Sequence, residues 1–132
     1  MIDDYAHHPA EVTASLKAAR PPAGGRLTVL FQPHLYSRTQ QLRREFAHAF
    51  LASDQQFVLP VYAAREAPKP GVEGSSIVEE AVRLGHPSAR FLPLREAAAA
   101  DVARALRPGD LCLTMGAGDV GDLAPAILRA LA

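Results

Sequence analysis

The sequence predicts an α/β domain with a Rossmann-like, mostly parallel sheet of about five or six strands and helices on both faces. Short apolar runs rich in β-forming residues alternate with helical patterns along the whole chain. The connections that follow these runs carry polar side chains, prolines and glycines, as strand-to-helix loops do. A length of 132 residues fits one domain with a core of its own.

The first element is the end of a strand that leads into a helix. Residues 3–9 place two carboxylates, a phenol and two imidazoles directly before Pro9. Proline suits the first position of a helix because its missing N–H would have no partner there. Because Met1 leaves no room for a full strand before these residues, the chain looks like a piece of a longer protein, cut at an artificial or domain boundary.

The helix that begins at Pro9 is expected to reach about Arg20, where the Pro-Pro-Ala-Gly-Gly run at 21–25 ends it. A buried strand is expected at 27–31, and an amphipathic helix at about 37–52. These two elements predict a second polar strand-to-helix connection between them.

A third strand is expected at 57–61, where Pro60 suggests an edge or an irregular position. Residues 62–75 contain two prolines and two glycines without periodicity, which predicts a long loop of the functional or mobile kind. A short helix at about 76–84 and a fourth strand at 90–94 follow. The remaining expected elements are an alanine-rich helix at about 95–106, a fifth strand at 111–115 and a final helix at roughly 123–131.

Composition excludes several classes of function. The chain has 14 basic and 14 acidic residues, so it lacks the basic surplus that nucleic acid or an anionic membrane requires. No apolar run approaches the roughly 20 residues that span a bilayer, and the N-terminus does not resemble a signal peptide. Cys112 lies in an apolar run, which predicts a buried thiol in a reducing compartment. We therefore expect a cytoplasmic protein.

A glycine turn follows the last expected strand. Gly116, Gly118 and Gly121 match G-x-G-x-x-G, but a dinucleotide site needs this motif after the first strand and an acidic residue about 20 positions later. The turn could present backbone N–H groups to an anion or could serve close packing, and both interpretations stay open. The chain also has no P-loop motif, so ATP chemistry would require a phosphate-binding loop from elsewhere.

Four motifs, which occur in the same order as in a known family, carry a family resemblance. They are Asp-Asp-Tyr-Ala-His-His-Pro at 3–9, Phe-Gln-Pro-His-Leu-Tyr-Ser-Arg-Thr at 31–39, Val-Tyr-Ala-Ala-Arg-Glu at 61–66 and Gly-Ala-Gly-Asp at 116–119. Together they resemble the C-terminal domain of the Mur ligases, in particular of the members that join L-alanine to UDP-N-acetylmuramate. The resemblance covers essentially the whole chain.

The resemblance implies that residues 1–132 are a single C-terminal domain of a three-domain enzyme of peptidoglycan synthesis. In this family ATP and Mg²⁺ serve to phosphorylate the muramoyl carboxylate, and the amine of L-alanine then attacks the acyl phosphate. The N-terminal domain for UDP-N-acetylmuramate and the central ATPase domain are absent here. The isolated chain is therefore expected to be inactive.

The resemblance also implies roles for individual residues. Asp4 matches the aspartate that reaches the nucleotide ribose, and Tyr5 and His7 match positions near the amino acid and the transferred phosphate. Arg38 matches an arginine that holds the amino-acid carboxylate, a task suited to a guanidinium. Where some relatives have a second arginine this chain has Leu35, so the clamp would rest on Arg38 alone or use His34.

The chemical role of His7, the candidate catalytic residue, stays open. A neutral imidazole could accept a proton from the ammonium nucleophile, and a charged one could bind phosphate oxygens. His8, Arg65 and Glu66 belong to the motifs but receive no role. Two further histidines, His48 and His86, lie outside the motifs and are expected at the surface.

Three other interpretations remain. A ligase that attaches a recycled peptide is the nearest one, although residues 32–39 favour the alanine enzyme. A noncatalytic module for nucleotide binding or dimerisation belongs to a different class. A metal site of His7, His8 and His34 is disfavoured, because adjacent histidines point in different directions and no further spaced ligand supports them.

Overall fold

The computed structural model describes the chain from residue 1 to residue 132, except for the side chains of residues 21–23. Its strands form one parallel sheet in the order β1-β5-β2-β3-β4. This arrangement confirms the predicted Rossmann-like α/β class. The strands are β1 (Ile2–Asp4), β2 (Leu27–Phe31), β3 (Gln55–Val58), β4 (Ala89–Phe91) and β5 (Leu111–Met115).

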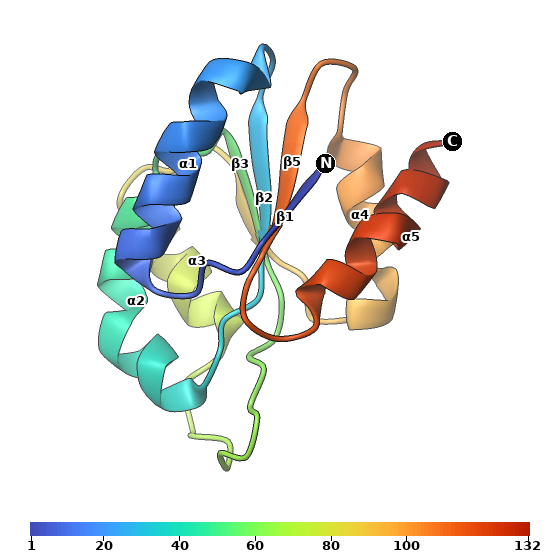
Figure 1. The fold of residues 1–132 in the computed structure, drawn as a ribbon. Helices are drawn as coiled ribbons and strands as arrows, with labels where there is room; N and C mark the ends of the chain where they lie inside the picture. The colour runs from blue at the N-terminus through green and yellow to red at the C-terminus, as the bar shows by residue number, and fades with distance from the viewer.

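Helices cover both faces of the sheet, as Figure 1 shows. On one face lie α1 (Pro9–Ala23), α2 (Tyr36–Phe50) and α3 (Gly74–Arg83), and on the other α4 (Arg95–Ala105) and α5 (Leu123–Leu131). A single 3-10 turn, η1 (Val120–Asp122), precedes α5. Helix α1 reaches Ala23, three residues beyond the expected end at about Arg20, so the expectation that the run at 21–25 ends the helix was placed too early.

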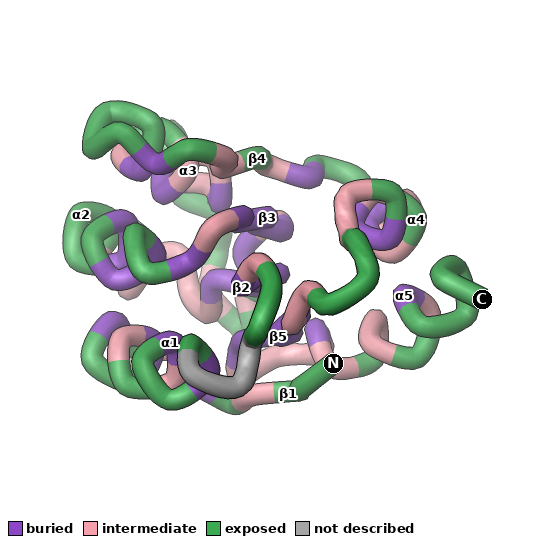
Figure 2. The backbone as a smooth tube through the Cα atoms, turned by 90° about the horizontal axis from the view of Figure 1, so that it is seen from above, coloured by how far each residue is buried: buried purple, intermediate pink, exposed green. Residues whose placement is uncertain are grey.

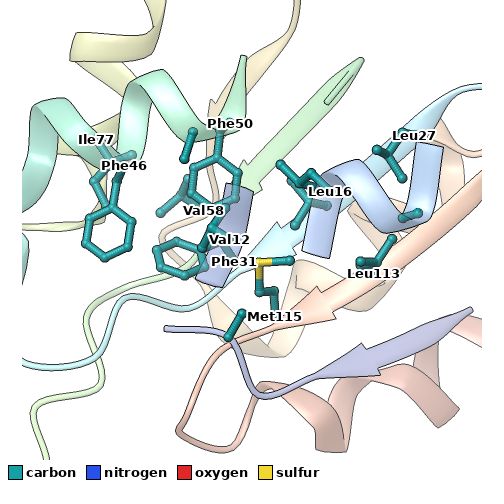
Figure 3. Close-up of a cluster of buried hydrophobic side chains, with 14 residues drawn as sticks. Val12, Leu16, Leu27, Phe31, Phe46, Phe50, Val58, Ile77, Leu113 and Met115 are labelled. Carbon is teal, nitrogen blue, oxygen red and sulfur yellow. The ribbon is translucent and has the colours of Figure 1, made fainter. Parts of the chain in front are cut away.

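Each face of the sheet has its own apolar core, so the central strands are buried on both sides (Figure 2). Under α1, α2 and α3, Phe31 of β2 packs against Phe46 and Phe50, with ring centroids 5.2 and 4.8 Å apart (Figure 3). Under α4 and α5, Phe57 and Leu30 belong to the second cluster. The alternation of side chains along each strand distributes neighbouring residues between the two cores.

Strand β3 differs from its prediction. It begins at Gln55, two residues earlier than expected, and ends at Val58. Its two glutamines, Gln55 and Gln56, are buried because β2 and β4 flank the strand. The first apolar residue of the run was therefore a poor guide to where the strand begins. Pro60 lies after the strand, outside the sheet, which fits the expected irregular position. Because β3 lies between β2 and β4, the alternative of an edge position was wrong.

Smaller differences concern the ends of the sheet. Strand β1 has only the three residues Ile2–Asp4, so it includes the two aspartates that begin the polar stretch. It pairs with β5 through Ile2 and Leu113 and through Asp4 and Met115. Strand β4 ends at Phe91, ahead of Pro93, instead of reaching residue 94. Helix α3 begins at Gly74 because the carboxylate of Glu73 accepts the N–H of Gly74 as an N-cap, 2.7 Å away.

Three predictions about single residues have clear outcomes. Cys112 is buried as expected, and burial raises the pKa of its thiol to about 12. His48 is exposed, but His86 is only 7% exposed, so its predicted surface position was wrong. Among the described residues, no helix has the length and apolarity needed to cross a membrane.

Candidate functional site

The candidate site lies at the carboxyl edge of the sheet, where the loops after β1, β2 and β3 meet. Four rings from these loops form a row, Tyr5–His7–His34–Tyr62, which we call the ring row. Its neighbouring centroids are 5.2, 6.2 and 5.6 Å apart, and the ring of Tyr62 stacks on that of His34 at 14°. Residues distant in sequence are thus brought into one line.

The loop after β2 is held by the loop after β3. The N–H of Leu35 donates to the carbonyl of Tyr62 at 2.9 Å, and the N–H of Tyr62 donates to the carbonyl of Pro33 at 2.8 Å. Leu35 has φ = 72°, a conformation that a branched side chain rarely adopts. These hydrogen bonds keep the backbone in that strained turn, which presents His34 and begins helix α2.

Arg38, in the first turn of α2, contacts His34, which lies in the loop just before that helix. A nitrogen of the guanidinium lies 3.4 Å from Nδ1 of His34. Because a guanidinium can only donate, Nδ1 must accept, and the proton of the neutral ring is then on Nε2. Burial, together with the nearby charge of Arg38, lowers the pKa of His34 from its ordinary value of 6.5. His34 is therefore neutral at pH 7.

His7 has the complementary tautomer. Its Nδ1 lies 3.0 Å from the carbonyl oxygen of Tyr5, and a carbonyl can only accept. Nδ1 thus carries the proton of the neutral ring, and Nε2 holds a lone pair. Oε1 of Glu11, 3.5 Å from Nδ1, also faces this side of the ring. The arrangement leaves Nε2 of His7 able to accept a proton from a ligand.

His8 has a local structural role instead. Its Nδ1 accepts the N–H of Ala10 at 3.3 Å, while its own N–H donates to Glu11 at 3.1 Å. This pair forms the capping box of α1. The signal was present in the sequence, because a glutamate three residues after the cap is the known pattern, but histidine is an unusual cap.

A surface hollow of about 370 Å³ adjoins Arg38. Its lining combines the guanidinium with apolar side chains of the strained turn and of α2. The lining residues are His8, Leu35, Ser37, Arg38, Gln41 and Leu42. Among the described residues, Arg38 has no carboxylate within 4 Å. Its charge is thus available to an anionic ligand.

Asp4 lies apart from the ring row. One oxygen of its carboxylate, Oδ1, accepts the N–H of Ala6 at 2.8 Å, which organises the turn after β1. Asp4 lines a different hollow, of about 260 Å³, with Ser15 and Ala19 of α1. The structure therefore brings together Tyr5, His7, His34 and Arg38 but leaves Asp4 in a hollow of its own.

Sequence reasoning missed the role of Gln32, the first residue after β2. Its Nε2 donates to Asp119 at 2.7 Å, and its Oε1 accepts the N–H of Val120 at 3.2 Å. Helices α2 and α5, which follow neighbouring strands β2 and β5, leave on opposite faces, so this is the crevice where doubly wound folds bind ligands. Here Gln32 and Asp119 line a hollow of about 220 Å³.

The glycine turn serves close packing. A Cβ atom on Gly118 would lie 2.5 Å from Oε1 of Gln32 and 2.7 Å from the ring of Tyr62. A Cβ on Gly121 would lie 2.6 Å from the carboxylate of Asp3. Of the two interpretations left open by the motif, the contacts support packing, and the N–H of Val120 already has its partner in Gln32.

A histidine metal site receives no support from the geometry. His8 is used as a helix cap, and the rings of His7 and His34 meet edge to face. Within the part of the chain that the structure describes, no three His, Cys, Asp or Glu side chains gather as metal ligands do.

Known sequences match almost the whole chain. The family described as "Mur ligase, glutamate ligase domain" matches residues 1–118. The UDP-N-acetylmuramate--L-alanine ligase of Kineococcus radiotolerans is 53% identical over 100% of this chain and 28% of its own length. The ligase of the same name from Mycobacterium sp. (strain JLS) is 55% identical over 99% of this chain and 27% of its own. The chain thus spans little more than a quarter of these relatives.

Solved structures share the fold. A domain from a putative UDP-N-acetylmuramate:L-alanyl-gamma-D-glutamyl-medo-diaminopimelate ligase of Haemophilus ducreyi has a TM-score of 0.73 at 24% identity, covering 98% of this chain and 89% of that one. The UDP-N-acetylmuramate-alanine ligase of Thermotoga maritima has a TM-score of 0.68 at 24% identity, covering 95% of this chain and 25% of that one. These likenesses show the shared fold. The sequence matches, which cover most of the chain, place this protein in the Mur ligase family, as a C-terminal ligase domain.

Proposed function

We propose that this chain is the C-terminal domain of an ATP-dependent cytoplasmic ligase that joins L-alanine to UDP-N-acetylmuramate through an acyl phosphate. The observation that carries the proposal is the grouping of His7, His34 and Arg38 at the carboxyl edge of the sheet. Relatives that are named for this activity and are more than 50% identical to the chain support it. The N-terminal and central ATPase domains would supply the remaining parts.

In this proposal Arg38 binds the carboxylate of the incoming amino acid. Its guanidinium has no carboxylate partner among the described residues, and the adjoining hollow has room for a small ligand. Neutral His34 would add its Nε2–H as a second donor, in place of the arginine that some relatives have at Leu35. Apolar atoms of Leu35 and Leu42 suit a methyl side chain.

His7 would act on the amine. An ammonium group must lose a proton before it can attack an acyl phosphate, and the lone pair on Nε2 of His7 can accept it. Tyr5, whose ring meets the edge of His7 and is 69% exposed, would cover the same region. Positioning of this kind depends on closure of the other domains over the edge.

The fit to ATP and Mg²⁺ is unequal. Asp4 uses one carboxylate oxygen for Ala6, so the other could accept hydrogen bonds from ribose hydroxyls. Oxygen ligands for Mg²⁺ are not gathered anywhere in the described residues, and we assign no metal ligand to this chain. The phosphates of ATP and the Mg²⁺ ion would therefore be bound mainly by the central domain.

A chimaera tests the proposal. This chain would replace the matching C-terminal segment of the Kineococcus radiotolerans ligase, with which it is 53% identical over its full length. We expect phosphate release that depends on both UDP-N-acetylmuramate and L-alanine. Activity only with an L-alanyl-γ-D-glutamyl peptide would instead favour the recycling ligase. Tight nucleotide binding by the isolated chain, without ligase activity in the chimaera, would favour a noncatalytic module.

A further inference from the structure

Helix α2, which carries Arg38 in its first turn, lacks a cap from its own sequence. Its N-cap residue is Leu35, whose side chain cannot accept a hydrogen bond. The first N–H groups of a helix need acceptors, and an uncapped end frays. Since Arg38 lies two residues into α2, fraying would move its guanidinium away from His34.

Glu66, from the long loop after β3, supplies the missing cap. One oxygen of its carboxylate accepts the N–H of Ser37 at 3.0 Å, and the other accepts the hydroxyl of the same residue. These hydrogen bonds from Ser37 hold the pKa of Glu66 below its usual range. The carboxylate therefore remains charged at pH 7, as a helix N-terminus favours.

The loop is shaped to deliver this carboxylate. A tight turn returns the chain, since the N–H of Glu66 donates to the carbonyl of Ala63 at 2.9 Å. Within it Ala64 has φ = 54°, a conformation that favours glycine. At the start of the same loop Tyr62 binds the turn at Leu35 and stacks on His34. One short segment thus holds both sides of the Arg38 and His34 pair.

We propose that Glu66 is a positioning residue for the amino-acid site, which acts through Ser37 to hold Arg38 against His34. This inference rests on the proposed function, because it assigns Arg38 to the carboxylate of L-alanine. It gives a role to the Val-Tyr-Ala-Ala-Arg-Glu motif, which lies apart in sequence from the residues that it orders. Glu66 itself need not touch the substrate.

The test uses the chimaera with the Kineococcus radiotolerans ligase and compares Glu66→Ala, Glu66→Gln and Ser37→Ala. We expect Glu66→Ala to raise the KM for L-alanine about tenfold, as loss of a charge-assisted hydrogen bond would. The KM values for ATP and UDP-N-acetylmuramate should stay within about twofold, because the proposed function assigns those ligands mainly to the N-terminal and central domains. Glu66→Gln, which keeps the shape and one acceptor, should give a smaller rise.

A double variant tests whether the two residues act as one device. Ser37→Ala removes only the hydroxyl donor and keeps the backbone N–H, whereas Glu66→Ala removes both hydrogen bonds. The double variant should therefore raise the KM for L-alanine no more than Glu66→Ala alone. Additive effects would overturn the proposal. Should Glu66→Ala fail to fold, Glu66→Gln and Ser37→Ala provide the same comparison.

Asp54→Asn is the matched control. Asp54 also accepts a backbone N–H, from Leu27 at 2.7 Å, but precedes β3 at the opposite edge of the sheet. This variant should lower stability without changing the KM for L-alanine. The positioning role alone would be overturned if Asp54→Asn raised the KM for L-alanine as much as Glu66→Ala does. It would also be overturned if Glu66→Ala left that KM unchanged in a chimaera whose wild-type form is active. A wild-type chimaera without activity on L-alanine would overturn the proposed function, and this inference with it.

Discussion

The two edges of the sheet use the same residue types in opposite ways. At the amino edge, Arg26 and Asp110 precede β2 and β5 and form a closed pair at 2.7 Å. At the carboxyl edge Arg38 has only a 3.4 Å contact with a neutral histidine. The charges of Arg26 and Asp110 are thus satisfied within the chain whereas, among the described residues, the charge of Arg38 is not, which supports the proposal that a ligand binds at the carboxyl edge.

The histidines repeat this contrast. His86, before β4, accepts the N–H of Ser88 at 3.0 Å through Nδ1, and its Nε2 lies 3.1 Å from the carbonyl of Phe50. Both ring nitrogens are thus used by the protein. His34 and His7 each use one nitrogen within the chain, as far as the described contacts extend, and can offer Nε2 to a ligand. The two edges therefore differ less in residue type than in whether the hydrogen-bonding atoms of these residues have partners within the protein.

The largest expected effect is at the amino edge. Asp110→Ala should lower the free energy of unfolding by about 3–5 kcal/mol, because Arg26 would lose its partner. The side chain of Asp110 is 4% exposed and also accepts the backbone N–H groups of Arg26 and Arg107, at 3.1 and 2.9 Å. Denaturant unfolding of the chain measures this, and a loss below about 1 kcal/mol would contradict the contrast between the edges.

At the carboxyl edge the effect should be on binding instead. Arg38→Ala in the chimaera should raise the KM for L-alanine about 10- to 100-fold, with little change in stability. Arg44→Ala, on the exposed surface of the same helix, is the matched control and should leave the KM unchanged. If Arg38→Ala kept the KM within about twofold, Arg38 would not be the carboxylate ligand.

The smallest expected effect is a pH dependence at His86. Burial lowers the pKa of His86 from its ordinary value of 6.5, against opposing hydrogen bonds to Phe50 and Ser53 and the charge of Asp54. Between the lowered pKa and 6.5 the unfolded state binds a proton that the native state does not, so stability should rise with pH and then level off.

His86→Gln should flatten this profile, whereas His48→Gln, at an exposed position, should leave it unchanged. Denaturant unfolding at a series of pH values from 4 to 8 would measure both. A profile that keeps its slope in His86→Gln would assign the pH dependence to another group.

The sequence predicted most of the fold because alternating patterns report burial directly. The helices α2, α4 and α5 lie close to their expected ranges, and β2 and β5 match theirs. The pattern did not predict that β3 includes Gln55 and Gln56, because the burial of these polar residues depends on the neighbouring strands. His86 was misjudged for the same reason.

For the candidate site, motifs found the residues but could not group them. Nothing local separates Asp4, which lines a hollow beside α1, from His7, three residues later in the ring row. Glu66 and Tyr62 received no role because their partners, Ser37 and His34, lie 29 and 28 residues earlier in the chain.

By itself, then, the sequence determined the order of strands and helices and which loops carry ionisable side chains, because periodicity and turn chemistry are local properties. Only the tertiary structure decided which of those side chains meet and which ring nitrogens of His7, His34 and His86 the protein itself uses. The reason is physical: contacts across a parallel sheet join residues far apart in the chain, and their protonation depends on those neighbours.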